Sequence, residues 1–123
     1  MLSWRIMYIA INKFKVKTEK ADDFEKVWKD RQSYLSEVPG FMRFWLLRTQ
    51  TEECAEFLSH SQWVNETAFQ GWRTSDQMKK AHSQGSSVAP MMLGHPEFRA
   101  YDLVLDQVAG HRTDYRSVFI DTK

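Results

Sequence analysis

The sequence has little cysteine, no strong charge imbalance and no long apolar run. The only cysteine, Cys54, has no second thiol with which to form an internal disulfide or a zinc site, which favours a reducing compartment. With 17 basic and 16 acidic residues the net charge is +1, so no long-range field favours nucleic acid or an acidic membrane as a partner. No apolar run approaches the roughly 20 residues that span a bilayer, and the first residues lack the apolar core of a signal peptide. We therefore expect a cytoplasmic protein, or an organellar (chloroplast) one if a transit peptide has been removed.

Several catalytic signatures are also missing from the sequence. It has no glycine-rich phosphate loop, no nucleophile elbow around a serine, and no strand with the mixed basic and aromatic residues of an RNA-binding sheet. His60, His95 and His111 do not follow a recognisable metal-ligand spacing, and no carboxylates gather around a histidine as non-haem iron requires. These classes of function are therefore not expected.

Aromatic side chains are what the chain has in excess. It contains eight Phe, five Trp and four Tyr in 123 residues, a length that suits one compact domain. So many rings in a small domain either line a site for a flat apolar ligand or fill a core and a dimer interface, and composition alone does not choose between these readings.

The hydrophobic pattern predicts four strands and three helices. Alternating or continuous apolar runs predict strands, helical spacing after a capping residue predicts helices, and clusters of Gly, Ser and Pro predict loops. Asn65 and Thr74 are the predicted caps of two short consecutive helices. In chain order the predicted segments are a strand at 6–16, a helix at 19–37, strands at 41–49 and 55–64, the helix pair at 65–82, a loop at 84–93 and a strand at 96–108.

This order is typical of an α+β, ferredoxin-like split βαβ fold, with helices on one face of an antiparallel sheet. The other face of such a sheet needs cover, and a second copy that meets it sheet to sheet would bury it. We therefore predict a symmetric homodimer. The predicted domain spans residues 1–108, and residues 109–123 form a C-terminal tail that is polar enough to be an arm packing on the partner subunit.

Asn12 is the unexpected polar residue of the first predicted strand. It shares a face with Tyr8, Ala10, Phe14 and Val16, so a primary amide stands where the pattern asks for an apolar side chain. An amide buried without a hydrogen-bond partner costs about 1 to 3 kcal/mol. Either a bound ligand or local backbone near the strand end would satisfy it, and the pattern leaves both open.

Trp72 and His82 lie ten residues apart, on either side of the predicted helix break at Thr74. In one straight helix they would stand about 15 Å apart, whereas a break lets the indole and the imidazole converge on one cavity. A neutral imidazole is a common ligand of haem iron, and the small Ala81 beside it leaves room for a flat macrocycle. Taken singly, a helix-end histidine is more often a surface residue favoured by the helix dipole, and a tryptophan is more often part of the core.

A longer set of residues gives a family resemblance. Residues 12–16 read Asn-Lys-Phe-Lys-Val, Phe69 follows Trp63 by six residues, and residues 72–82 read Trp-Arg-Thr-Ser-Asp-Gln-Met-Lys-Lys-Ala-His. This combination resembles the haem-degrading monooxygenases of the antibiotic-biosynthesis-monooxygenase superfamily over about residues 6 to 106. The family pattern has a strand-ending Trp, a short helix ending in Trp, a Ser-Asp step, and a helix ending in Lys-x-Ala-His or close to it. Residues 94–98 are further similar to a subset of homologues in bacteria and photosynthetic eukaryotes.

The resemblance implies a dimeric β-barrel with one haem per subunit, in a cleft between helices and sheet. It implies that His82 is the axial ligand of the haem iron, that Asn12 hydrogen-bonds the oxygen on the distal side, and that Trp72 presses on the porphyrin. An indole against one sector would push the macrocycle out of plane, so that a meso carbon meets the oxygen that the amide steers. The catalytic and haem-binding residues that it implies are therefore Asn12, Trp72 and His82.

The expected function is that of a haem oxygenase, which uses molecular oxygen and electrons from a reductase or small reductant to release iron and an open-chain tetrapyrrole. Two alternatives stay open: a haem-binding carrier or sensor without turnover, and a cofactor-independent monooxygenase of a phenolic or quinol substrate, which the same fold permits. Ile11 and Lys13 flank Asn12 where many family members have acidic or arginine residues. The propionate contacts and the product are therefore left open.

Overall fold

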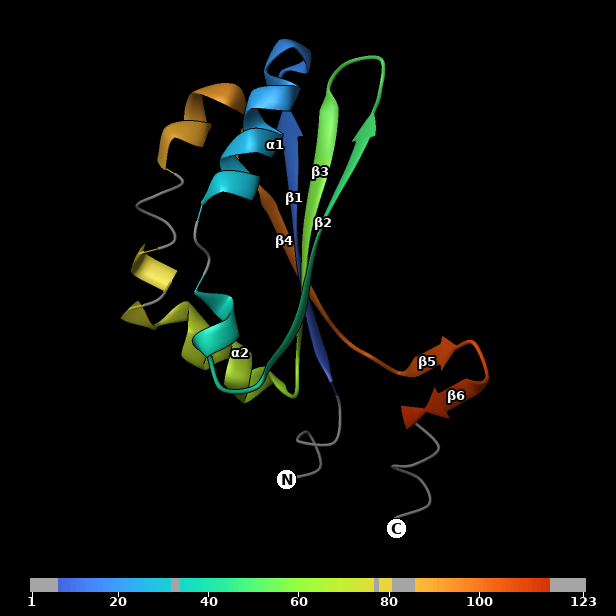
Figure 1. The fold of residues 1–123 in the computed structure, drawn as a ribbon. Helices are drawn as coiled ribbons and strands as arrows, with labels where there is room; N and C mark the ends of the chain where they lie inside the picture. The colour runs from blue at the N-terminus through green and yellow to red at the C-terminus, as the bar shows by residue number, and fades with distance from the viewer. Residues whose placement is uncertain (1–6, 32–33, 77, 81–85, 116–123) are drawn as a thin grey trace.

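A four-stranded antiparallel sheet with helices on one face forms the fold, in the strand order β2-β3-β1-β4 (Figure 1). The computed structural model describes residues 7–31, 34–76, 78–80 and 86–115. The strands of the sheet are β1 (Tyr8–Val16), β2 (Phe41–Gln50), β3 (Ala55–Trp63) and β4 (Glu97–Asp102), and the α-helices are α1 (Ala21–Asp30) and α2 (Glu66–Arg73). Short 3-10 helices are η2 (Thr18–Lys20), η3 (Leu35–Glu37) and η4 (Ser86–Met91), and a separate hairpin joins β5 (Leu105–Val108) to β6 (His111–Asp114). The predicted ferredoxin-like α+β fold is confirmed. The sheet of the single chain is open, so the closed dimeric barrel stays a prediction.

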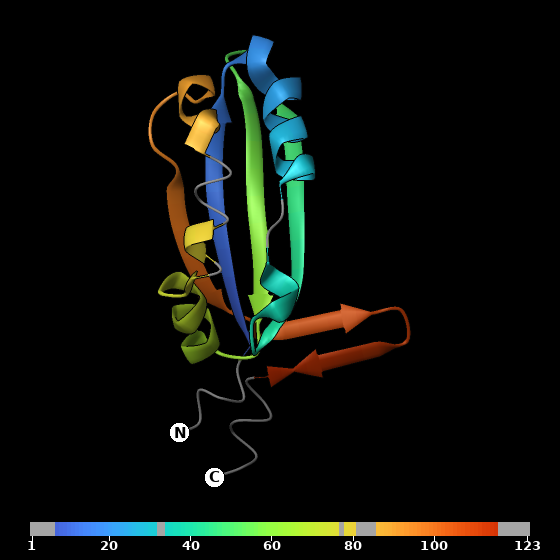
Figure 2. The same cartoon turned by 60° about the vertical axis from the view of Figure 1, so that its left-hand side comes forward.

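The core lies between the sheet and the helices in two separate clusters. Because side chains alternate along a strand, every second residue of β1 faces the helices, and these are the positions that the sequence pattern singled out. Ala10 packs with Trp63 and Phe69 of α2 in one cluster, whereas Val16 packs with Phe24 of α1 in the other. Complete burial of a side chain such as Phe24 or Trp63 stabilises the fold by about 1.5 to 3 kcal/mol. Figure 2 shows both helices in front of the sheet, α1 over one end of the strands and α2 over the other.

The helix predicted over residues 19–37 is shorter in the structure. After α1, Arg31 is in an extended conformation with ψ of 147°, and the next helical residues that the structure describes are those of η3. The apolar periodicity continues past Arg31 because Leu35 and Val38 are also buried, but they belong to the cluster under α2 rather than to the cluster under α1. The chain therefore has to break its helix in order to fill both clusters.

Gly40 determines how closely β2 and α2 approach each other. Its φ is +85°, and a Cβ atom at this position would lie 2.5 Å from the Cβ of Ala68. The amide of Val64 donates to the Gly40 carbonyl at 2.9 Å, and the Asn65 side chain accepts from the amide of Ala68 at 2.9 Å. The predicted N-cap at Asn65 is therefore confirmed.

The helix break after α2 is one residue away from its predicted cap. Ser75, not Thr74, caps the following helical residues, because its hydroxyl accepts from the amide of Met78 at 3.1 Å. The Thr74 hydroxyl instead donates to the carbonyl of Gln70 at 3.2 Å. Residues 76 and 78–80 are helical, and the region predicted as a loop at 84–93 contains η4.

The strand predicted over residues 96–108 is divided into β4 and β5. The amide of Leu103 donates to the carbonyl of Met7, after which the chain leaves the sheet and forms the β5–β6 hairpin around Gly110. Figure 1 shows this hairpin projecting on the side of the sheet opposite the helices. The predicted boundary between residues 108 and 109 falls in the turn of this hairpin, and the division into a domain and a tail stays a prediction. No helix in the described part of the chain is long and apolar enough to cross a membrane.

Candidate functional site

Asn12 lies on the helix-covered face of the sheet, between the two core clusters. The residues that pair with it on the neighbouring strands are Ser59 on β3 and Phe98 on β4. Ser59 is buried and Asn12 is half-buried, so two polar side chains lie side by side on the face that holds the core. Among the described residues the Asn12 amide makes no hydrogen bond. Of the two partners that the sequence left open, local backbone is therefore not the one used, and the amide is available to a ligand.

Trp28 and Arg31 form the wall of this site on the α1 side. The Trp28 indole is stacked on Phe44 of β2, with centroids 5.8 Å apart and planes at 15°, and it meets Phe14 of β1 edge to face at 5.7 Å. The Arg31 guanidinium lies 4.1 Å from the centroid of the Trp28 ring. Phe14 on β1 and Phe44 on β2 lie on either side of β3. Because the Trp28 indole contacts both rings, it covers β3 near Ser59.

The Arg31 guanidinium has no anionic partner among the described residues. Its Nε atom is buried and has no hydrogen-bond partner in the described structure, and no salt bridge between described residues includes its guanidinium. Burial lowers the pKa of this guanidinium, since desolvation disfavours the charged form. Arg31 was not predicted to be a site residue. The signal in the sequence is its position three residues after Trp28, on the apolar side of the helix predicted over 19–37, where a solvated arginine is not expected.

Trp72 lies on the same covered face as Asn12. It stacks on Trp63 at 6.3 Å with planes at 28°, and Trp63 is fully buried, with its indole nitrogen donating to the Ser61 hydroxyl at 2.9 Å. Ala10, the next residue of β1 on the Asn12 side of the sheet, belongs to the cluster that Trp72 packs against. The structure therefore places Trp72 at the edge of the core beside the site. Its pressure on a bound ring stays a prediction.

His82, the predicted axial ligand, lies outside the described residues. The last described residue before it, Lys80, has its Nζ atom 5.6 Å from the centroid of the Tyr34 ring. Tyr34 directly precedes η3 and follows Arg31 by three residues.

A groove of about 460 Å³ runs between α1 and β2, and the large aromatic and aliphatic side chains of the site form its walls. This volume lies within the range of small-molecule sites, about 300 to 1,000 Å³. The lining residues are Glu25, Trp28, Lys29, Phe44, Leu46, Arg48 and Phe57. Leu46, which lines the groove on β2, pairs with Ser59 on β3, and Ser59 pairs with Asn12 on β1. The groove therefore lies on the β2 side of Asn12 and Ser59.

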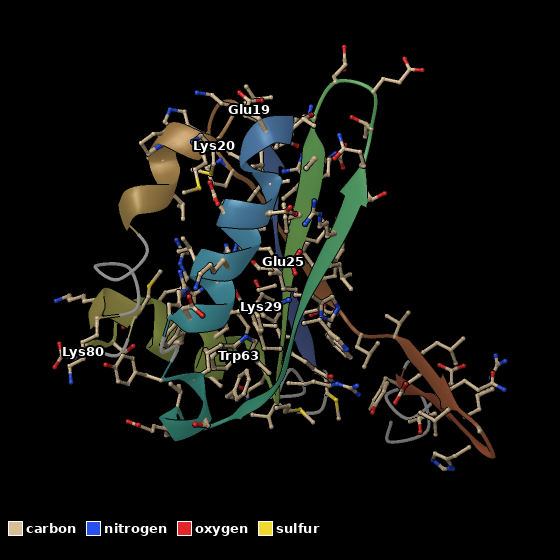
Figure 3. All side chains as sticks on the ribbon, turned by 45° about the horizontal axis from the view of Figure 1, so that its top comes forward. Glu19, Lys20, Glu25, Lys29, Trp63 and Lys80 are labelled. Carbon is tan, nitrogen blue, oxygen red and sulfur yellow. The ribbon has the colours of Figure 1, made fainter. Side chains whose placement is uncertain are left out.

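Charged side chains are also part of the lining of the groove, among them Glu25 and Lys29 of α1, which Figure 3 labels. Arg48 donates from one Nη1 atom to Asp22 at 2.9 Å and to Glu25 at 2.7 Å, and Lys29 donates to Glu25 at 2.6 Å. Hydrogen bonds from Lys29 and then from Arg48 hold the pKa of the Glu25 carboxyl below its usual range. These exposed pairs satisfy one another, so the lining, unlike Arg31, has no unmet charge.

Three kinds of group on this side of the molecule are open to a ligand as far as the described residues show: aromatic rings, the Asn12 side-chain amide, and the Arg31 guanidinium. Of these, only the aromatic rings line the groove. No group of three or more His, Cys, Asp or Glu side chains that could hold a metal ion occurs among the described residues.

Known proteins share the sequence pattern and the fold of this chain. The family model described as antibiotic biosynthesis monooxygenase matches residues 7–84. A search of curated proteins found no match. Among solved structures, a variant of MhuD with two manganese protoporphyrin IX molecules bound per active site is 27% identical, with a TM-score of 0.67, covering 82% of this chain and 98% of that one.

Two further solved structures show how varied the similar proteins are. A Caulobacter crescentus protein assigned to the antibiotic biosynthesis monooxygenases is 27% identical with a TM-score of 0.64, covering 84% of this chain and 94% of its own. SnoaB from Streptomyces nogalater, a cofactor-independent oxygenase, is 18% identical with a TM-score of 0.62, covering 86% of this chain and 99% of its own. At that identity the likeness to SnoaB shows a shared fold alone.

Proposed function

The chain belongs to the antibiotic biosynthesis monooxygenase family, and from this premise we propose that it is a haem-degrading monooxygenase. The observation that supports the proposal best is that, among the described residues, the Asn12 side-chain amide and the Arg31 guanidinium have no hydrogen-bond or salt-bridge partner beside the two aromatic clusters. Haem is a flat apolar ring with two carboxylates on one edge, so it carries partners of both kinds. Haem is here the substrate, molecular oxygen the oxidant, and an external reductase or small reductant the source of electrons. The products are iron and an open-chain tetrapyrrole.

In this proposal each residue has a separate task. The imidazole of His82 would hold the iron of haem, which would supply the chemistry with oxygen. The Asn12 side-chain amide would donate a hydrogen bond to the oxygen and so orient it for attack on a meso carbon. Arg31 binds a propionate, which supplies the anion that its guanidinium lacks. Trp72, fixed by its stacking on Trp63, presses on one sector of the ring.

The proposal includes a homodimer, because the described residues place no helix on one face of the sheet. On the face opposite the helices, the side chains of Leu47 and Tyr101 are 47% and 52% exposed. The β5–β6 hairpin projects on this same side, and Leu105 and Val108 on it are also exposed. A two-stranded hairpin alone is marginally stable in water, so it needs a surface to pack on. A second copy on the bare face would provide this surface for each hairpin by symmetry.

The test is titration of the purified protein with hemin, followed by reductant in air. We expect a Soret band of a histidine-ligated haem, loss of that ligation in His82→Ala but not in the matched control His95→Ala, and bleaching of the band when reductant and oxygen are both present. A carrier or sensor would give the same band but no bleaching. A Soret band that reductant and oxygen leave unchanged would refute the enzymatic proposal.

A second candidate, a cofactor-independent oxygenase, is favoured by one specific observation. The groove between α1 and β2 has aromatic walls and a volume of about 460 Å³, which suits a small phenolic or quinol substrate without haem. This candidate predicts oxygen consumption with such a substrate in the absence of hemin, and loss of that activity when Leu46→Trp fills the groove. Activity that depends strictly on hemin would exclude it.

A further inference from the structure

The groove between α1 and β2 lies apart from the Asn12 side chain. Its lining includes Trp28 and Leu46 but neither Asn12 nor Arg31. Leu46 pairs with Ser59 and Ser59 with Asn12, so Leu46 and Asn12 lie two strand spacings apart, which corresponds to about 10 Å. Trp28 lines the groove and also has the Arg31 guanidinium over its ring, at 4.1 Å. A small molecule in the groove therefore lies beside a haem that contacts Asn12 and Arg31, not in its place.

Aromatic and aliphatic side chains form the apolar part of the groove. Trp28 of α1 stacks on Phe44 of β2 with centroids 5.8 Å apart, and Leu46 lies on the same face of β2 as Phe44. Phe57 of β3, which is fully buried, completes this part of the lining. The volume of about 460 Å³ accommodates a molecule of one or two rings. Burial of such rings against these side chains favours binding.

The charged part of the lining can both accept and donate hydrogen bonds. Lys29 and Arg48 pair with Glu25, and Arg48 pairs also with Asp22, so two cations balance two carboxylates and an uncharged ligand is favoured. Lys29 and then Arg48 lower the pKa of the Glu25 carboxyl, which therefore stays an acceptor at neutral pH. Arg48 uses only its Nη1 atom for these bonds, so its Nε and Nη2 atoms can donate to a further oxygen.

We propose that this groove binds the electron donor of the reaction, a small uncharged quinol, an inference that rests on the proposed haem degradation. A quinol is an apolar ring whose hydroxyl groups become carbonyls on oxidation. Glu25 accepts from a hydroxyl of the reduced form, and Arg48 donates to an oxygen of either form. Oxidation of one quinol breaks two O–H bonds and yields one quinone, two electrons and two protons. The electrons go to the haem and to molecular oxygen, across about 10 Å, and the protons go to solvent beside the partly exposed Glu25.

Binding is tested first without haem, by NMR titration of the protein with duroquinone, the oxidised form of a fully methylated quinol. We expect a saturable shift of the Trp28 indole N–H signal, which is assigned from its loss in Trp28→Phe. Loss of a hydrogen bond to a charged group corresponds to about tenfold or more in an equilibrium constant, so Arg48→Met should raise the Kd at least tenfold. The matched control is Arg43→Met, on the same strand and the opposite face, which should retain the wild-type Kd.

Electron transfer is tested next, by mixing the ferric haem complex with duroquinol in the absence of oxygen and under carbon monoxide, which traps ferrous haem. The rate of reduction should saturate as the duroquinol concentration rises. Arg48→Met should raise the concentration at half-saturation by about the factor by which it raises the Kd for duroquinone. Ascorbate, a hydrophilic anion that does not suit the groove, should reduce the wild type and Arg48→Met at the same rate.

Several results would overturn the proposal. A reduction rate proportional to the duroquinol concentration and unchanged in Arg48→Met shows that the donor has no site in the groove. Displacement of duroquinone by hemin shows that the groove belongs to the haem site. Oxygen consumption with duroquinol that the haem-free protein catalyses shows that the quinol is the substrate. A wild-type protein without a Soret band refutes the proposed function and this inference with it, whereas a normal Soret band without duroquinone binding refutes this inference alone.

Discussion

Replacing Arg31 with methionine should stabilise the protein without haem and weaken its binding of haem. The side chain has one buried, unsatisfied Nε atom and one favourable contact, the guanidinium 4.1 Å from the Trp28 centroid. Relief of a buried unsatisfied donor contributes about 1 to 3 kcal/mol, whereas a cation–π contact that is partly desolvated contributes about 0.5 to 2 kcal/mol. Methionine keeps an unbranched apolar stem over the indole. We therefore expect Arg31→Met to raise the free energy of unfolding by about 1 kcal/mol, or a few degrees in Tm.

The effect of the same substitution on haem has the opposite sign. A hydrogen bond to a charged group contributes about 1.5 to 3 kcal/mol, so loss of the bond to a propionate should raise the Kd for hemin by roughly 10- to 150-fold. Urea unfolding measures the first effect and optical titration with hemin measures the second.

Arg43→Met is the matched control, because its guanidinium lies at the same 4.1 Å from an indole, that of Trp45, on the opposite face of the sheet. It should lower the free energy of unfolding slightly and leave the Kd for hemin unchanged. If Arg31→Met destabilises the protein by 2 kcal/mol or more and leaves that Kd unchanged, Arg31 is a structural residue and the reasoning is wrong.

Three further predictions concern other parts of the molecule. Gly40→Ala should lower the free energy of unfolding, measured in urea, by about 2 kcal/mol or more, because it adds backbone strain at positive φ and a clash at 2.5 Å with Ala68. Gly110 has the same φ of +85° but open space around it, so Gly110→Ala should show the smaller effect of the strain alone. Asn12→Ala should leave the free energy of unfolding unchanged or raise it, because its side-chain amide has no hydrogen-bond partner among the described residues. The same change should remove haem turnover but not haem binding, and a loss of more than about 1 kcal/mol in stability would show that the amide is structural. Burial within the folded chain lowers the pKa of His60, so folding favours the neutral ring, and its contribution to stability should be present above the ordinary pKa of 6.5 and be lost as the pH falls below it. Urea unfolding should therefore show a lower free energy of unfolding at pH 5.5 than at pH 7.5, and an equal pH dependence in His60→Gln would contradict this.

The sheet could be predicted from the sequence because each strand has a strong local signal. Alternation along β1 and the apolar runs of β2 and β3 gave boundaries within one or two residues of those observed. The errors lie where two tertiary demands compete for one segment. The helix after Thr18 ends early because Leu35 and Val38 serve the second cluster, and the last strand is divided because the chain leaves the sheet after Asp102.

The site was predictable only in part. Asn12 could be found because a polar residue on an apolar face is visible in the pattern itself, and the structure leaves its amide without a partner among the described residues. Arg31 and Phe98 could not be found in this way. The burial of Arg31 depends on where α1 ends, and the position of Phe98 depends on which residue of β4 pairs with Asn12. Such pairings between distant segments have no local signature.

The central claim is that this protein degrades haem, and mass spectrometry of its haem complex tests it most directly. The complex is prepared without oxygen, then exposed to oxygen and reductant, and the tetrapyrrole is extracted. The account predicts an open-chain tetrapyrrole with released iron, formed only when both oxygen and reductant are present, together with a one-carbon product that identifies the fate of the meso carbon. Recovery of intact protoporphyrin from a complex that shows a Soret band would contradict it.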